Sequence, residues 1–220
     1  MKTSASVVVA GIDVGGARKG CHLVILQDRE VVCVAKSTNP EDLYQECLRQ
    51  TVEVVGIDSP CRWSLDGTGR LAEKELASER IFCFSTPTQD RAEASTSGFY
   101  GWMFCGETVF QTFAPTYPLL TEKRYSGGRG TFETFPHAIT CSLLGKEVTS
   151  AKLKRVQRRK LLEDAGIDTG SLTSIDAVDA ALCALTAELL VLGRTRAYGD
   201  AHGGYIFVPD PNLGKLRSLV

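Results

Sequence analysis

Two apolar segments of this chain lead into the same tripeptide, Gly-Ile-Asp, and this repeated ending strongly limits the folds available. One segment is Val7–Asp13, and the other is Val52–Ile57, which Asp58 follows directly. Short apolar runs rich in valine and isoleucine are typical of buried strands. A carboxylate at the end of a buried strand is costly unless its charge is compensated. The two segments therefore predict core strands that bring Asp13 and Asp58 to one sheet edge.

The rest of the chain alternates strand and helix patterns. Cys21–Leu26 and Val31–Ala35 predict a hairpin, which forms an antiparallel meander with the first strand. Asn39 can cap a helix, because proline and two acids follow it. A helix is also predicted over Arg70–Arg80, and the apolar periodicity of Ser174–Leu192 predicts a further helix. Other predicted elements are strands at 81–84, 131–135 and 205–208, the last at a sheet edge, and helices at 99–113 and 152–165. This order predicts an α/β fold with one mixed sheet flanked by helices.

Composition narrows the class of protein. The chain has 220 residues, of which 43% are hydrophobic and 23% charged. These values predict a single globular domain over residues 1–220. The longest apolar runs are far shorter than the ~20 residues of a membrane span, so no membrane partner is expected. A net charge of −1 argues against a strongly basic nucleic-acid binder but leaves a local basic patch open.

The spacing of the eight cysteines also limits the class of protein. None of them forms a C-x-x-C pair, which argues against zinc ribbons and thioredoxin-type motifs. The amino-terminus also lacks the pattern of a secretory signal. We therefore expect reduced thiols in a cytoplasmic protein.

The paired aspartates suggest a metal site. If their strands are neighbours, Asp13 and Asp58 repel each other, and one pKa must rise. A divalent cation relieves that repulsion, because hard cations prefer oxygen ligands. Magnesium or manganese suits such ligands better than zinc, since no cluster of histidine and cysteine is present. The alternative is that each aspartate caps a turn or the following helix.

Three further acids can join this pair. Asp176 and Asp179 are three residues apart and share one side of a helix start. Asp179 borders the apolar stripe, whereas Asp176 lies nearer to solvent and reaches the site only if the helix start opens onto it. Acids in a first helical turn can instead simply complement the helix dipole. Glu133 stands between aromatics in Thr131-Phe-Glu-Thr-Phe-Pro136, where it points either into the same cleft or outward.

Four motifs, taken in order, resemble those of a known family. They are Gly-Ile-Asp-Val-Gly, Gly-Ile-Asp-Ser-Pro, Glu-Thr-Phe-Pro and Asp-x-x-Asp-Ala-Ala-Leu-Cys-Ala. The set resembles a large family that is catalogued as a domain of unknown function and described as predicted nucleases with a ribonuclease-H fold. The resemblance spans roughly residues 7–208. The last motif is also similar to the C-terminal Asp-x-x-Asp-Ala-Leu helix of Holliday-junction resolvases.

The resemblance implies a site and an activity. It places Asp13, Asp58, Asp176 and Asp179 at metal-binding positions, adds Glu133 as a further catalytic acid, and implies Mg²⁺ or Mn²⁺. The chemistry expected of such a site is phosphodiester hydrolysis with two metal ions, in which Asp13 is the candidate bridging ligand. The protein is therefore expected to be a metal-dependent nuclease or a related phosphoesterase. The aromatic stretch Phe99–Phe113 and the glycine-rich loop after it have no counterpart in a minimal ribonuclease H. The comparison therefore implies an insertion at about 85–130, which argues against a long duplex substrate.

Two other classes of function remain open on the sequence alone. Asp13-Val-Gly15 is also similar to the first phosphate loop of the actin and sugar-kinase superfamily, although those enzymes normally need two such lobes. A non-catalytic binding module on the same fold is the third alternative, since fold does not decide function. The sequence does not indicate an oligomeric state.

Basic and aromatic residues supply candidate contacts to nucleic acid or nucleotide. Lys152, Arg155 and Arg159 share one face of a predicted helix and can contact phosphates, as can Arg129 in the glycine-rich loop. The alternative for the helix is an ordinary solvated face. Aromatic side chains between 99 and 113 can stack on bases or form core.

Overall fold

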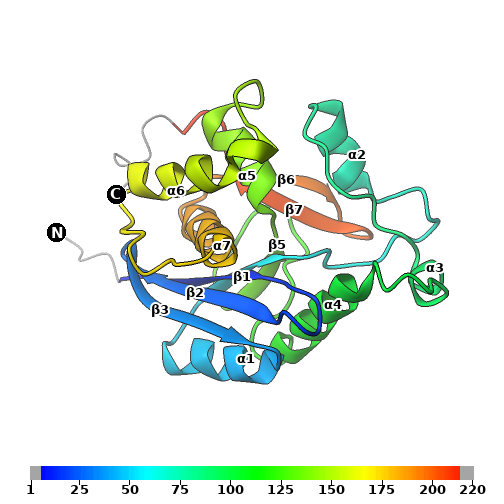
Figure 1. Ribbon diagram of the computed structural model, residues 1–220, viewed down its shortest axis with the longest axis horizontal. Coiled ribbons are helices and arrows are strands. Elements are labelled where there is room, and N and C mark those ends of the chain that lie inside the picture. Colours follow the sequence, from blue (N-terminus) through cyan, green and yellow to red (C-terminus); the bar gives the residue numbers. More distant parts are fainter. Residues whose placement is uncertain (1–5, 214–220) are drawn as a thin grey trace.

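The computed structural model describes residues 6–213, which form a seven-stranded mixed sheet (Figure 1). The strand order is β3-β2-β1-β4-β5-β7-β6. The pairs β1–β4, β4–β5 and β5–β7 are parallel, whereas β1–β2, β2–β3 and β6–β7 are antiparallel. The strands are β1 (Val8–Asp13), β2 (Cys21–Gln27), β3 (Glu30–Ser37), β4 (Val54–Asp58), β5 (Gly130–Glu133), β6 (Thr195–Asp200) and β7 (Gly204–Pro209).

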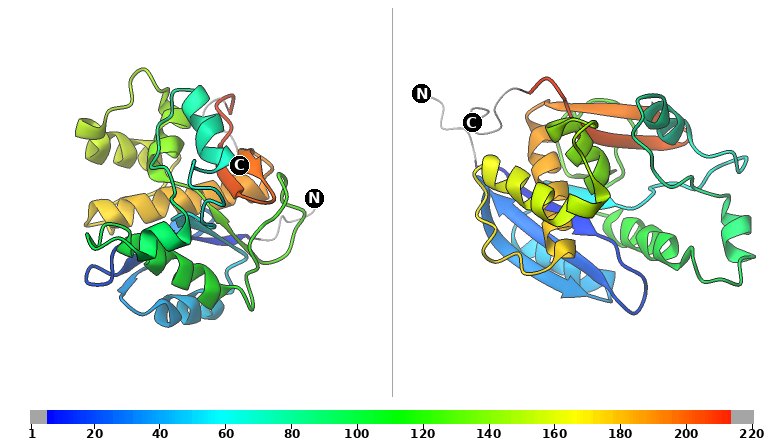
Figure 2. Two further views of the ribbon diagram at one scale, coloured as in Figure 1. Left: turned by 90° about the vertical axis from the view of Figure 1, so that its right-hand side faces the viewer. Right: turned by 45° about the horizontal axis from the view of Figure 1, so that its top comes forward.

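Helices cover both faces of the sheet (Figures 1 and 2). On one face lie α1 (Pro40–Arg49) and α4 (Gly101–Phe113), and on the other lies α7 (Ile175–Val191), with α6 (Lys154–Asp164) packed against it. The remaining helices are α2 (Leu71–Ser78), α3 (Gln89–Glu93), α5 (Pro136–Leu144) and the 3₁₀ turn η1 (Ala151–Leu153). The expected α/β class, with a three-stranded meander beside parallel strands, is confirmed. It is consistent with a ribonuclease-H-like arrangement.

The glycines of the two Gly-Ile-Asp motifs explain how closely α7 approaches the sheet. A methyl group on Gly11 would lie 2.0 Å from the Ala180 carbonyl oxygen of α7. At Gly56 it would lie 2.7 Å from the Cys183 carbonyl oxygen. The helix backbone therefore rests directly on β1 and β4. Because side chains alternate along a strand, each aspartate two residues later points to this same face.

This close approach yields a stability prediction. Gly11→Ala forces a methyl group into helix backbone that cannot rotate away, so we expect the free energy of unfolding to fall by roughly 1–3 kcal/mol. Gly16→Ala is the matched control, because nothing lies within 4 Å of the added methyl group. Urea unfolding of both variants measures the difference. Equal midpoints would contradict direct contact between α7 and β1.

Several local predictions were wrong. Residues 81–84 are not a strand but a segment without regular secondary structure, in which Ile81 packs inward and Phe82 is 70% exposed. The strand β7 is not at the edge, because β6 follows α7 and pairs with it from outside. The polar sequence of β6 hides its strand character. Helix α5 was also missed, since its short apolar stretch after a proline has no clear polar face.

The segment at 85–130 contributes to the main core. Helix α4 packs beside α1, and Val109, Phe110 and Phe113 join Leu43 in one apolar cluster. The later aromatics of the stretch are therefore core residues, whereas Phe99, at its start, is 55% exposed. Among residues 6–213, no helix combines the length and apolar character that crossing a bilayer requires.

Candidate metal centre

Asp13 and Asp58 end neighbouring parallel strands in the same register. Asp13 pairs with Asp58 across β1 and β4, where strands lie about 4.8 Å apart. Both side chains project to the face that α7 covers, and α7 brings Asp176 and Asp179 on its first turns. Four of the predicted acids therefore gather at one end of the sheet, as the sequence indicates.

The electrostatics of Asp13 reflect this crowding. The side chain is only 8% exposed, and burial together with repulsion from Asp179 and Asp176 raises its pKa to about 7. Lys19 and Arg158 lower the pKa but do not offset that rise. Metal-free Asp13 is thus only partly ionised near neutral pH, and a bound cation would favour the ionised carboxylate.

Asp58 and Asp179 are shifted in the same direction. Burial raises the pKa of Asp58 well above its ordinary value, and repulsion from Asp13 and Asp179 adds to the rise. Burial also raises the pKa of Asp179, against the lowering effect of Arg158. Three carboxyl groups that disfavour their own charge at one place are typical of functional sites.

A histidine that sequence reasoning missed completes the acidic cluster. His22 lies opposite Asp13 in the antiparallel β1–β2 pair and projects to the same face. One ligand atom each from Asp13, His22 and Asp176 lies within 4.8 Å of the other two. Burial lowers the pKa of His22, which favours the neutral, metal-ligating imidazole. The predicted hairpin register was the signal that could have revealed it.

Two cations border the acids. Lys19 Nζ contacts Asp176 Oδ1 at 2.7 Å, and that contact is the largest cause of the raised pKa of Lys19. Arg158 Nη1 contacts Asp179 Oδ2 at 2.6 Å. Arg158 was also missed, although it shares the buried face of α6 with Leu161 and Leu162 at helical spacing.

The donor set fits a hard divalent cation. Asp179 Oδ1 is buried and has no hydrogen-bond partner within residues 6–213, and the same holds for His22 Nδ1. A carboxylate oxygen left bare in this way is costly unless another group satisfies it. The carboxylate oxygens of Asp13 and Asp176 suit Mg²⁺ or Mn²⁺, whereas Asp58 and Asp179 lie outside that ligand group and act on it through their charge.

The basic residues predicted to contact phosphate lie at two separate places in the structure. Lys152 and Arg155 are exposed on η1 and α6, and Arg155 and Arg159 line a groove that reaches Ser174 at the start of α7. Arg159 already donates to the carbonyls of Thr169 and Leu172 at 2.8 and 2.7 Å. The structure does not bring Arg129 to this site, because it precedes β5 and therefore lies at the other end of the sheet, over Tyr117.

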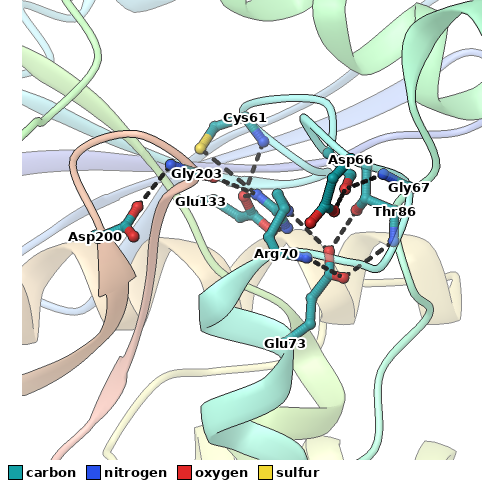
Figure 3. Close-up of polar contacts among 10 residues, drawn as sticks. Cys61, Asp66, Gly67, Arg70, Glu73, Thr86, Glu133, Asp200 and Gly203 are labelled. Atoms are coloured by element: carbon teal, nitrogen blue, oxygen red, sulfur yellow. Dashed lines mark hydrogen bonds and ion pairs between the residues drawn. The ribbon is translucent and has the colours of Figure 1, made fainter.

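Glu133 ends β5 but is held by an arginine (Figure 3). Both of its carboxylate oxygens accept from Arg70, each at 2.6 Å, and Oε2 also accepts from the Cys61 amide at 2.8 Å. Arg70 Nε donates to Glu73 at 2.8 Å. Arg70 and Glu73 are three residues apart on one helix turn, yet they are not a surface pair, since both are buried.

A cavity of about 300 Å³ adjoins the acidic cluster. Asp58 lines one side, the Arg70–Glu133 pair lines another, and aromatic rings supply much of the remaining wall. The aromatic lining residues are Phe82, Phe84, Trp102, Phe135 and His137. The cavity therefore places a flat, apolar surface beside one of the clustered acids.

Comparison with known proteins identifies the family. The family described as "Protein of unknown function (DUF429)" matches residues 11–203. The chain belongs to this family. The DUF429 match contains all of the clustered acids as well as His22, Arg70 and Arg158. Neither the curated proteins nor the solved structures give a match.

Proposed function

We propose that this DUF429 protein is a Mg²⁺- or Mn²⁺-dependent nuclease that hydrolyses phosphodiester bonds. The observation that carries the proposal is the convergence of Asp13, Asp58 and Asp179 at one end of the sheet, where burial raises the pKa of each and repulsion from a neighbouring aspartate adds to the rise. The buried Oδ1 of Asp179 supports the same conclusion, because no group within residues 6–213 donates a hydrogen bond to it and a cation could satisfy it.

Each residue has a distinct role in this proposal. Asp13 and Asp176 would hold the cation, and Asp58 and Asp179 would supply further negative charge beside it. When bound, such ions activate water and stabilise the leaving oxygen of a phosphodiester. His22 lies within reach of the same centre.

The surrounding cations would bind and orient the substrate. Lys19 is half-exposed beside Asp176, and Arg155 is exposed on the groove that leads to the start of α7. Both side chains are accessible to a substrate that approaches from solvent, and both can contact its phosphate oxygens. Arg158 stays buried against Asp179 and therefore orients that carboxylate.

We also propose a cytoplasmic location. All eight cysteines are unpaired in the structure, and Cys47 and Cys183 are fully buried. Burial raises the pKa of the Cys183 thiol well above its ordinary value, so the thiol stays protonated and unreactive. Free thiols of this kind agree with a reducing compartment.

The decisive experiment is a cleavage assay with a metal series. Single-stranded, structured and duplex DNA and RNA are incubated with Mn²⁺, Mg²⁺ or chelator. We expect Mn²⁺-dependent cleavage that falls at least 100-fold, about 2.7 kcal/mol, in Asp13→Asn, because a central metal ligand is lost.

An exposed acid provides the matched control. Asp90→Asn, in the short helix α3, should leave cleavage unchanged. Full activity in chelator, or in Asp13→Asn, would contradict the proposal. Binding of Mg-ATP without any cleavage would favour the sugar-kinase alternative instead.

A further inference from the structure

The aromatic cavity beside Asp58 contains features that metal chemistry alone does not need. Phe82 is 70% exposed and Phe84 is 42% exposed, although both rings border the cavity. Phe84 contacts Trp102 edge-on, with ring centroids 6.4 Å apart. Solvent-exposed aromatic rings around a cavity are typical of a ligand-binding surface.

Part of the cavity lining is polar and is held in place by hydrogen bonds. Arg70, Glu73 and Glu133 line it, each at most 5% exposed and joined to its neighbours by charged hydrogen bonds. Thr134 also lines it, and its buried hydroxyl has no hydrogen-bond partner among the described residues. A ligand that fits here needs a flat apolar ring with polar atoms on its edge.

We infer that the cavity holds one unstacked nucleobase of the substrate, with the attached phosphate directed toward Asp58. This inference rests on the proposed nuclease function and specifies its substrate class. A nucleobase has both required properties, a π-face for the aromatic walls and hydrogen-bonding groups on its edge. A volume of about 300 Å³ lies at the small end of ligand pockets, which suits one base rather than a stacked pair.

The inference excludes an intact duplex as the preferred substrate. A paired base is stacked on both faces and must leave the helix before it can enter a pocket. Single strands, loops and extruded nucleotides expose such a base at little cost. The substrate is therefore a single-stranded or locally unpaired nucleic acid.

The two tryptophans of the chain provide a direct test. Trp102 lines the cavity, whereas Trp63 lies outside it, beside Phe104 and hydrogen-bonded to Glu107. Trp63→Phe leaves Trp102 as the reporter, and Trp102→Phe leaves Trp63 as its matched control. Each protein is titrated with ten-residue oligothymidylate in Ca²⁺, and binding is measured independently by anisotropy of a labelled strand.

The expected result is quenching of Trp102 fluorescence and no response from Trp63. Oligothymidylate should bind roughly 10-fold more tightly than an abasic strand of equal length, because base stacking is lost in the latter. Thymidine 5′-monophosphate shows whether a free nucleotide also binds in the cavity, and a 10-base-pair duplex should give no quenching. Equal affinity for the abasic strand, or quenching of Trp63 alone, would overturn the inference.

Exposed side chains supply variants that do not disturb folding. Phe82→Ala should weaken strand binding roughly 10-fold, whereas Leu65→Ala, at a residue that is 81% exposed and outside the cavity, should have no effect. Base-dependent binding without cleavage of any substrate would refute the nuclease proposal and keep the base pocket. If cleavage occurs at rates that Phe82→Ala and Trp102→Phe do not change, the base pocket is refuted and the nuclease proposal is kept.

Discussion

The metal-free protein is expected to lose stability as the pH rises from 5 to 8, and Mn²⁺ is expected to restore it. The pKa of Asp13 is about 7 in the folded chain, against an ordinary value of 3.8. Between these values the folded state keeps a proton that the unfolded state releases, so unfolding becomes easier as the pH rises. The full shift corresponds to roughly 4 kcal/mol. Asp58 and Asp179 shift in the same direction.

The metal response should follow the opposite order. At pH 8 the carboxyl groups are deprotonated and repel one another, so a bound cation stabilises the folded state by mass action. At pH 5 protons compete with the cation for the same oxygens. The increase in melting temperature caused by Mn²⁺ should therefore be several degrees at pH 8 and small at pH 5. Thermal melts with Mn²⁺ or chelator at both pH values measure it.

Asp13→Asn tests two properties of the site separately, namely the destabilisation by the buried carboxylate and the binding of a cation. The amide has a similar shape but no charge, so in chelator at pH 8 the variant should melt about 5 °C above the wild type. Its melting temperature should also stop responding to Mn²⁺. Asp90→Asn is the surface control and should retain the full Mn²⁺ response. A lower melting temperature for Asp13→Asn, or an unchanged metal response, would contradict a shared cation site.

The sequence predicts this cluster well because its determinants are local. Strand alternation places Gly11 and Asp13 on one face, and an identical motif in the parallel neighbour repeats the arrangement at Gly56 and Asp58. The apolar stripe of α7 then decides that Asp179 faces the sheet. Each step depends on residues within one element, so periodicity is sufficient.

The contacts that were missed join elements far apart in the sequence. His22 reaches Asp13 only through the hairpin register, and Arg158 reaches Asp179 only because α6 packs on α7. The partner of Glu133 is 63 residues away on the N-terminal side, in Arg70. Nothing in the local pattern around Glu133 distinguishes an acid that binds metal from an acid that binds arginine.

Arg70→Met is expected to lower the free energy of unfolding by about 3–5 kcal/mol, because it leaves two buried carboxylates without their cation. Glu133 would lose both arginine contacts, and Glu73 would lose the contact from Nε. Backbone amides of Cys61 and Thr86 still donate to these acids, but they bring no positive charge. Urea unfolding at pH 7.5 measures the loss.

Two further variants show whether charge is the cause. Adding Glu133→Gln to Arg70→Met removes one uncompensated carboxylate and should recover part of the lost stability. Arg91→Met, at an exposed arginine in α3, should stay within about 0.5 kcal/mol of the wild type. A loss below about 1 kcal/mol in Arg70→Met would show that solvent reaches the pair and compensates the acids.

The same variants bear on the role of Glu133. In the structure its two oxygens already bind Arg70, so its first effect is to fix the wall of the aromatic cavity next to Asp58. If that is its whole role, Glu133→Gln should weaken binding of oligothymidylate and leave the Mn²⁺-dependent rise in melting temperature intact. If Glu133 also contacts the metal, the Mn²⁺ response must fall with it. Melting curves and anisotropy on one variant therefore separate a positioning residue from a ligand.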